Sequence, residues 1–152
     1  MHVVLVEPEI PPNTGNVSRT CAVTETKLHL VRPLGFSISD RELKRAGLDY
    51  WDQLSYYVHD DFESVERMLA GHPFYLATTK GETYFYEVAY PRDSVLVFGK
   101  ETAGLPSELL DRYAPNTIKI PMAKGFRSLN LSNSVAVILY EALRQHHFVG
   151  LY

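Results

Sequence analysis

The sequence has a single cysteine, Cys21, in 152 residues, so no disulfide can form within one chain. Secreted domains often depend on disulfides, and we therefore expect this chain in the reducing cytoplasm. The apolar run at residues 2–6 is followed at once by Glu7 and Pro8, which makes it too short for a signal peptide or a membrane span. These absences exclude a disulfide-stapled domain and predict a protein that has no membrane partner.

Several well-known site motifs are also missing. No G-x-G-x-x-G follows the first apolar run, so the dinucleotide fingerprint is absent. Gly99 and Gly104 have the spacing of a phosphate loop, but Leu105 and Pro106 stand where Lys and Ser or Thr are required. There is no H-E-x-x-H and no paired-cysteine spacing, so we expect no metal site. The lone cysteine is expected in the core rather than as a nucleophile.

The chain carries no excess of positive charge. Lysine and arginine total 15 against 18 for aspartate and glutamate, which gives a formal net charge of -3. A generic nucleic-acid-binding domain is basic. If RNA is a partner, its contacts must come from a local basic patch, and its binding must weaken as salt is added.

Apolar and β-branched runs alternate with helical patterns along the chain. We expect strands at residues 2–6, 28–31, 56–59, 74–78, 94–98 and 117–120. A helix with Asn13 as its N-cap is expected after the first strand, and further helices at residues 39–46, 62–70 and 107–113. Residues 82–90 fit either a strand or a loop. Such alternation predicts an α/β fold with a mostly parallel sheet and helices on both faces. With no repeat or linker, residues 1–152 are expected to form a single domain.

The last helix is unusually apolar. One stripe repeats at helical spacing, at Leu131, Val135, Ile138, Leu139 and Ala142. Further apolar residues, among them Val137 and Tyr140, occupy much of the opposite face. A helix that is apolar nearly all round is buried on more than one side. Two interpretations fit: a second copy of the chain covers the other side, or the helix lies at the centre of one large core.

Three of the expected strands end in glycine-containing loops: A-T-T-K-G, F-G-K-E-T-A-G-L-P and I-P-M-A-K-G-F-R-S-L-N-L-S-N. Ligands of parallel α/β folds bind at the carboxyl ends of strands, so the three loops predict one composite pocket. The polar run at residues 128–134 offers more hydroxyls and amides than a helix cap needs. It fits either a ligand site or an over-capped helix start.

These segments resemble the motifs of a known superfamily. N-T-G-N-x-x-R at residues 13–19, F-G-K-E-T-A-G-L-P at 98–106, and I-P-M with R-S-L-N-L-S-N-S-V-A at 120–136 are similar to the three motifs of the SPOUT methyltransferases. Their order and spacing match the branch that methylates ribose 2′-hydroxyls of RNA. The similarity extends through E-P-E-I-P-P-N-T-G-N, R-E-L-K-R-A-G-L-D-Y-W and T-T-K-G, and so covers nearly the whole chain.

The resemblance implies a trefoil knot in the C-terminal part of the α/β fold, an obligate homodimer, and S-adenosyl-L-methionine as the methyl donor without a metal ion. General topology rules disfavour knots, and nothing in the periodicity predicts one. The cofactor contacts that the resemblance implies lie in the three loops: Ala77, Thr78, Gly99, Glu101, Gly104, Ile120, Met122, Ser128 and Leu129.

The resemblance also implies an RNA substrate. This would be the ribose of the wobble nucleotide, cytidine or 5-carboxymethylaminomethyluridine, in the anticodon loop of leucine tRNAs. Alternatives are another tRNA or ribosomal RNA site, or a knotted RNA-binding protein without catalytic activity. The candidate RNA contacts are Lys80, Lys124 and Arg127, whose charges suit phosphates, and Asn130.

The catalytic candidates are Arg19, Asn16 and Ser132. The resemblance gives Arg19 the role of general base. Because guanidinium groups stay protonated in proteins, orienting an RNA phosphate or stabilising a developing oxyanion are alternative roles for it. Asn16 and Ser132 are candidates for positioning the ribose hydroxyl.

Overall fold

A computed structural model of the chain describes residues 1–38 and 53–152. Its main elements are β1 (His2–Val6), α1 (Pro11–Val23), β2 (Lys27–Val31), β3 (Tyr56–His59), α3 (Phe62–Met68), β4 (Phe74–Ala77), β5 (Thr83–Tyr84), β6 (Val95–Phe98), α4 (Ser107–Arg112), β7 (Thr117–Lys119) and α5 (Leu131–Gln145). The short helix expected at residues 39–46 lies outside the described residues. No helix in the described part of the chain is long and apolar enough to cross a bilayer.

The strands form one seven-stranded sheet in the order β3-β2-β1-β6-β4-β7-β5. All pairings between these strands are parallel, as the alternating pattern predicted. The segment at residues 82–90, left open by the sequence, forms the two-residue strand β5 and then a 3₁₀ turn, η2 (Phe85–Glu87). The late strand β7 lies between two earlier ones, β4 and β5, and pairs with both.

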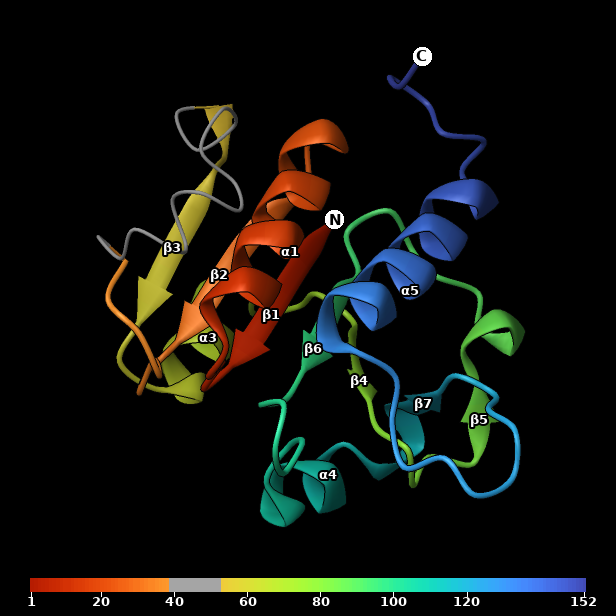
Figure 1. Cartoon of the computed structure of the whole chain (residues 1–152). Coiled ribbons are helices and arrows are strands. Elements are labelled where there is room, and N and C mark those ends of the chain that lie inside the picture. The colour runs from red at the N-terminus through yellow and green to blue at the C-terminus, as the bar shows by residue number, and fades with distance from the viewer. Residues whose placement is uncertain (39–52) are drawn as a thin grey trace.

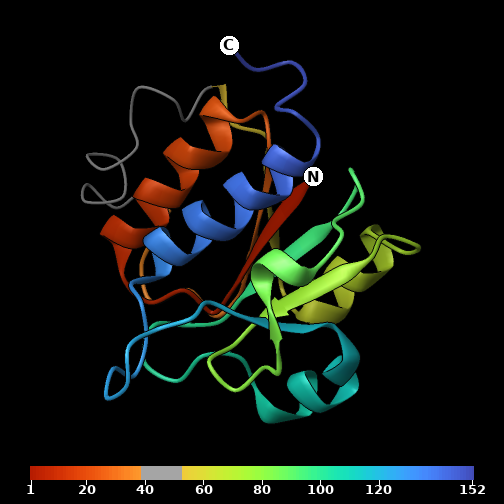
Figure 2. The ribbon, with the colours of Figure 1, turned by 90° about the vertical axis from the view of Figure 1, so that its right-hand side faces the viewer.

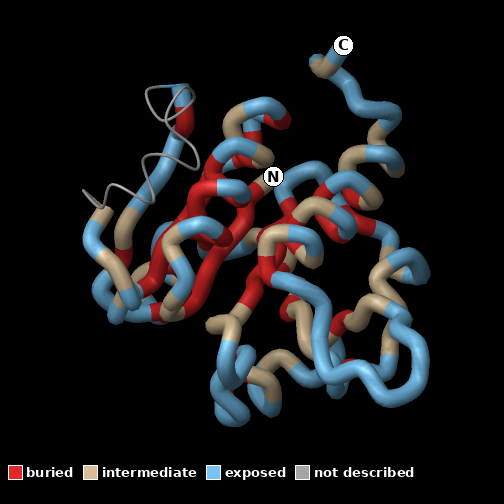
Figure 3. Tube along the Cα trace, in the orientation of Figure 1, coloured by how far each residue is buried: buried red, intermediate tan, exposed pale blue. Residues whose placement is uncertain are grey.

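Helices cover both faces of the sheet, which confirms the predicted layers (Figures 1 and 2). On one face α1 and α5 lie side by side, and their apolar residues pack on the strands; this core includes Leu5, Cys21 and Ile138. On the other face, α3 and α4 close a second core that includes Val97 and Leu109. The central strands are therefore buried from both sides, as Figure 3 shows in red.

The apolar stripe of α5 is buried as its spacing predicted. The buried residues of this helix are Leu131, Val135, Ile138, Leu139 and Ala142. On the opposite face Val137 and Tyr140 are 38% and 44% exposed. Within the described residues, α5 is therefore not enclosed on all sides by a single core. That a second copy covers this face stays a prediction.

The start of α1 differs from the sequence-based expectation. The helix begins at Pro11 with Ile10 as its N-cap, and Asn13 lies within the first turn. The prolines begin the helix because their fixed φ suits its first turn, where a missing backbone N–H costs no hydrogen bond. The expectation that Asn13 is the N-cap is therefore wrong, and the Asn13 side chain is available for contacts with other loops.

A row of buried histidines crosses β1, β2 and β3. The Nδ1 of His2 lies 3.0 Å from Nε2 of His29, and Nδ1 of His29 lies 2.9 Å from Nε2 of His59. Burial lowers the pKa of His2 to about 4 and that of His29 to about 3, and it also lowers the pKa of His59. The three rings are therefore expected to be neutral at physiological pH, with their nitrogens bonded to one another.

Candidate ligand-binding and active site

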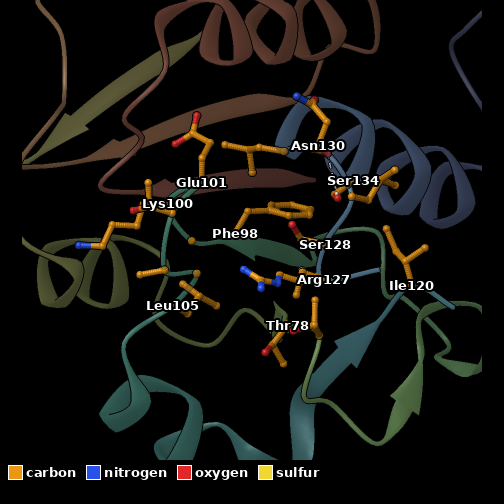
Figure 4. A pocket seen from close by; sticks show the side chains of 18 of the residues that line it. Thr78, Phe98, Lys100, Glu101, Leu105, Ile120, Arg127, Ser128, Asn130 and Ser134 are labelled. Atoms are coloured by element: carbon orange, nitrogen blue, oxygen red, sulfur yellow. Dashed lines mark hydrogen bonds between the residues drawn. The ribbon is translucent and has the colours of Figure 1, made fainter. Parts of the chain in front are cut away.

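A cavity of about 470 Å³ opens at the carboxyl ends of β4, β6 and β7 (Figure 4). These strands are neighbours in the sheet, so the loops that follow them meet at one edge. Its volume lies within the range of about 300–1,000 Å³ usual for small-molecule sites. The three glycine-containing loops therefore enclose a single pocket, as the sequence predicted.

The cavity has an apolar floor and a polar rim. Phe98, Leu105 and Ile118 line it and are 2%, 7% and 1% exposed. Thr78 and Ser128 bring hydroxyl groups to the wall. Figure 4 shows the side chain of Arg127 directed into the cavity, on the side of Leu105. The arrangement fits a ligand with a flat apolar part and a charged end.

The loop after β6 turns back tightly on itself. Gly104 has φ +71°, and its N–H donates to the carbonyl of Lys100 at 2.9 Å. A Cβ at Gly99 would lie 2.1 Å from the carbonyl carbon of Gly104 and 2.2 Å from the nitrogen of Leu105. Because both neighbours are backbone atoms, no side-chain rotation relieves that clash. Gly99 thus permits the close approach that shapes this wall of the cavity.

The same loop is fastened to the start of α1. The carboxylate of Glu101 accepts hydrogen bonds from the backbone N–H of Glu9 at 2.8 Å and of Ile10 at 3.2 Å. In the reverse direction, the backbone N–H of Thr102 donates to Glu9 at 3.0 Å and its hydroxyl at 2.7 Å, which lowers the pKa of the Glu9 carboxyl. Glu101 was predicted to contact a cofactor; it lines the cavity, but its oxygens are engaged with α1.

Asn13, in the first motif, is hydrogen-bonded to the second and third motifs. Its amide nitrogen donates to Glu101 at 3.0 Å, and its amide oxygen accepts from the amide of Asn130 at 3.0 Å. Asn130 is also the N-cap of α5, since its oxygen accepts from the backbone N–H of Ser132 at 3.0 Å and of Asn133 at 3.3 Å. Asn130 therefore caps the helix, as one interpretation of the polar run predicted, and it also lines the cavity. That the run binds a ligand stays a prediction.

All residues predicted to contact a cofactor line this cavity: Ala77, Thr78, Gly99, Glu101, Gly104, Ile120, Met122, Ser128 and Leu129. Of the predicted RNA contacts, Lys80, Arg127 and Asn130 line it, and Lys124 lies outside.

The three catalytic candidates do not line the cavity of the single chain. Arg19 and Asn16 lie exposed on α1, and the hydroxyl of Ser132 donates to Asn130 at 2.7 Å. All of these roles stay predictions.

Other lining residues were not singled out from the sequence. Phe98 is the last residue of β6, and its position at a strand end was the signal that could have found it. Ile118 lies in the middle of the three-residue strand β7, near the same edge of the sheet. Leu110, on α4, gives no such signal. Lys100 also lines the cavity, but its ammonium pairs with Glu7 at 2.8 Å, which raises the pKa of Lys100. In the part of the chain that the structure describes, no group of three or more His, Cys, Asp or Glu could hold a metal ion.

Comparison with known proteins gives similarity along the whole chain. The model of the SpoU rRNA methylase family matches residues 1–140. A tRNA (cytidine(34)-2'-O)-methyltransferase from Methylovorus glucosotrophus is 52% identical over 149 residues, 97% of each chain.

Solved structures agree with this similarity. A protein whose structure concerns the 2-OH methylation of C/U34 on tRNA superposes with a TM-score of 0.93 at 46% identity, over 96% of this chain and 95% of that one. The SpoU methyltransferase AviRb from Streptomyces viridochromogenes, in complex with AdoMet, has a TM-score of 0.84 at 26% identity, over 97% of this chain and 58% of the other. The fold, the three glycine-containing loops around one cavity and these similarities together show that the chain belongs to the SpoU methylase family.

Proposed function

We propose that this chain transfers a methyl group from S-adenosyl-L-methionine to the ribose 2′-hydroxyl of the wobble nucleotide of tRNA. One observation carries the proposal: the three glycine-containing loops enclose one cavity in a chain that is 52% identical, over 97% of both lengths, to a tRNA (cytidine(34)-2'-O)-methyltransferase. The substrate nucleotide is cytidine or a modified uridine, and leucine tRNAs are the expected carriers.

The residues of the cavity fit this methyl donor. Leu105, Ile118 and Ile120 provide apolar walls for a flat base, and Thr78 and Ser128 provide hydroxyls for its polar groups. Arg127, directed into the cavity, offers a guanidinium that matches a carboxylate in a bidentate pair. This placement favours a cofactor contact for Arg127 over the RNA contact predicted from sequence. When bound, S-adenosylmethionine supplies a methyl group activated by the sulfonium, so the transfer requires no metal.

The chain's own contribution to the chemistry is to place the ribose hydroxyl. A hydroxyl is a weak nucleophile, and holding it in line with the bond that breaks supplies much of the rate enhancement. Asn13 reaches the cavity from α1, and Arg19 lies roughly 9 Å further along the helix axis, from a rise of about 1.5 Å per residue. Asn16 lies between them on the exposed surface of α1. Arg19 there orients an RNA phosphate or stabilises the developing negative charge on the oxygen.

The assembly is a homodimer. Its support is the exposed apolar face of α5 together with neighbouring residues of α1: Val23 is 48% exposed and Tyr140 is 44% exposed. Side chains of this kind rarely remain in water when they are contiguous. A homodimer would also present to the RNA two copies of Lys80, in the loop after β4, and two copies of Lys124, in the loop between β7 and α5.

The remaining expectations complete the proposal. The C-terminal part is knotted; the position of β7 between β4 and β5, followed by the return of the chain to α5, supports this topology. Residues 1–152 act as one domain, in the cytoplasm.

Purified protein and S-adenosylmethionine with a labelled methyl group, incubated in parallel with unmodified tRNA and with unmodified ribosomal RNA, test the activity. We expect label in a 2′-O-methylated nucleoside at the first anticodon position. Label in ribosomal RNA instead would move the substrate to another RNA, and cofactor binding without transfer to either RNA would favour a non-catalytic RNA-binding protein.

A further inference from the structure

The loop between β7 and α5 presents a phenylalanine to solvent. All residues from 121 to 130 are exposed, and Phe126 is 73% exposed. Gly125, with φ +97°, and a hydrogen bond from the Phe126 N–H to the carbonyl of Ala123 at 3.4 Å form the turn that displays the ring. In Figures 1 and 2 this loop projects from the body of the molecule. No ring or cation–π contact of Phe126 is found within residues 1–38 and 53–152.

Phe126 is the sequence neighbour of a residue of the cavity wall but is not part of that wall. Met122 and Arg127, at either end of the turn, line the cavity, whereas Lys124 and Phe126 do not. A ligand held by the lining residues therefore leaves the exposed ring available to a second partner.

The charge around the ring favours a polyanion. From residue 113 to residue 140 the sequence contains no aspartate or glutamate, but it contains Lys119, Lys124 and Arg127. The chain as a whole has a net charge of -3, so this segment is a local reversal of sign. An exposed aromatic ring next to lysine and arginine is the composition that binds single-stranded nucleic acid, where bases stack on rings and cations meet phosphates.

A second copy of the chain is a less suitable partner for the ring. The exposed apolar residues that suit such an interface lie toward the C-terminal end of α5, where the rings of Tyr140 and Phe148 are 6.2 Å apart. Tyr140 is about 14 Å from the start of α5 along the helix axis, from a rise of about 1.5 Å per residue. The loop that carries Phe126 joins α5 at that start, so the ring lies at the other end of the helix from these apolar residues.

We propose that Phe126 is a substrate-positioning residue whose ring stacks on an unpaired base beside the methylated nucleotide, while Lys124 contacts the adjoining phosphate. The inference rests on the proposed function for the identity of the RNA. It adds a specific contact: a stacked base next to the target fixes the direction in which the ribose enters the cavity. Stacking on an aromatic ring tolerates any base, since each presents a π-face, so this contact positions the loop and does not read its sequence.

The test measures the affinity for an anticodon stem-loop RNA in Phe126→Ala, Phe126→Trp and Lys124→Ala, with Met68→Ala as the control. Met68 is 53% exposed on α3 and does not line the cavity. We expect Phe126→Ala to raise the Kd for RNA about five- to one-hundred-fold, the range of one base–aromatic stack, at an unchanged slope of log Kd against log salt. Lys124→Ala should reduce the slope of log Kd against log salt by about 1, the change expected when one phosphate contact is lost. Phe126→Trp should bind as the native protein does, and its added fluorescence should be quenched by RNA.

Native RNA affinity in Phe126→Ala, or unquenched Phe126→Trp, would overturn the inference. So would weaker S-adenosylmethionine binding or a shifted oligomeric state in Phe126→Ala, because either result makes the ring part of the cavity wall or of an interface. These binding assays need no turnover. If RNA binding depends on Phe126 but the protein transfers no methyl group, the proposed function is refuted and the stacking role of Phe126 still stands.

Discussion

Replacing Gly99 with alanine should damage stability and ligand binding together. The new Cβ would lie 2.1 Å from the carbonyl carbon of Gly104 and 2.5 Å from its oxygen, distances that side chains do not adopt. Overpacking costs about 1–3 kcal/mol, and the value here should lie near 3 because both facing groups are backbone. For a chain of this length that corresponds to a fall in melting temperature of about 6–12 °C. The loop that must move is a wall of the cavity, so affinity for S-adenosylmethionine should fall at least about tenfold.

Gly71→Ala provides a matched control for this experiment. Gly71 has φ +88°, and a Cβ there meets nothing within 4 Å, so alanine adds backbone strain of about 1 kcal/mol without a clash. Differential scanning calorimetry and isothermal titration with S-adenosylhomocysteine should show modest destabilisation and native affinity in this variant. If Gly99→Ala matches Gly71→Ala in both measurements, the close backbone approach does not shape the cavity as described.

Four further outcomes are expected. Arg19→Ala should abolish methyl transfer to tRNA yet keep native cofactor affinity by calorimetry, because Arg19 does not line the cavity; full activity would remove it from the mechanism. Asn13→Ala, which breaks the bonds to Glu101 and to the opposite loop, should lower the free energy of unfolding in urea by about 1–2 kcal/mol, and an unchanged value would deny that link a structural role. Burial lowers the pKa of His29 to about 3, so the folded protein binds fewer protons than the unfolded chain below pH ~6.5. The contribution of this ring to the free energy of unfolding should therefore be constant above about pH 7 and fall as the pH drops from about 6.5 toward 4, by up to about 1.4 kcal/mol per pH unit. His29→Gln should reduce the slope over that range in denaturation series, and an equal slope would place the protons elsewhere. Tyr140→Asp should convert a dimer at micromolar concentration into a monomer by light scattering, and a native protein that is already monomeric would refute the assembly proposed here.

The strands and helices with a regular pattern of apolar residues could be predicted from the sequence. Buried parallel strands are continuous β-branched runs, and the stripe of α5 from Leu131 to Ala142 follows the helical period, so both appear in the order of residues alone. The start of α1 could not be found in this way. A proline can end a helix or occupy its first turn, and the local sequence does not decide between these two roles. Here Pro11 begins α1, and the N-cap residue Ile10 donates its N–H to Glu101, which is distant in sequence.

The candidate site was predictable where it consists of loops at strand ends. The glycines at positions 99 and 104 lie in one of the three loops that meet at one sheet edge, and the polar run at the start of α5 lies in another. Leu110 and the link between Asn13 and Asn130 were not predictable, because they depend on how α4 and α1 pack across the sheet. The direction of the Arg127 side chain is likewise set by tertiary structure, and it changes which ligand that residue suits.

The most direct measurement is nucleoside mass spectrometry of the anticodon loops of tRNA from cells that lack this gene, compared with the same cells complemented by the native gene. We propose that three loops at one sheet edge enclose a methyl donor and that the protein methylates the wobble ribose. The 2′-O-methyl group at the first anticodon nucleotide should therefore disappear without the gene, and the native gene should restore it. A methylation profile unchanged by loss of the gene would contradict the account.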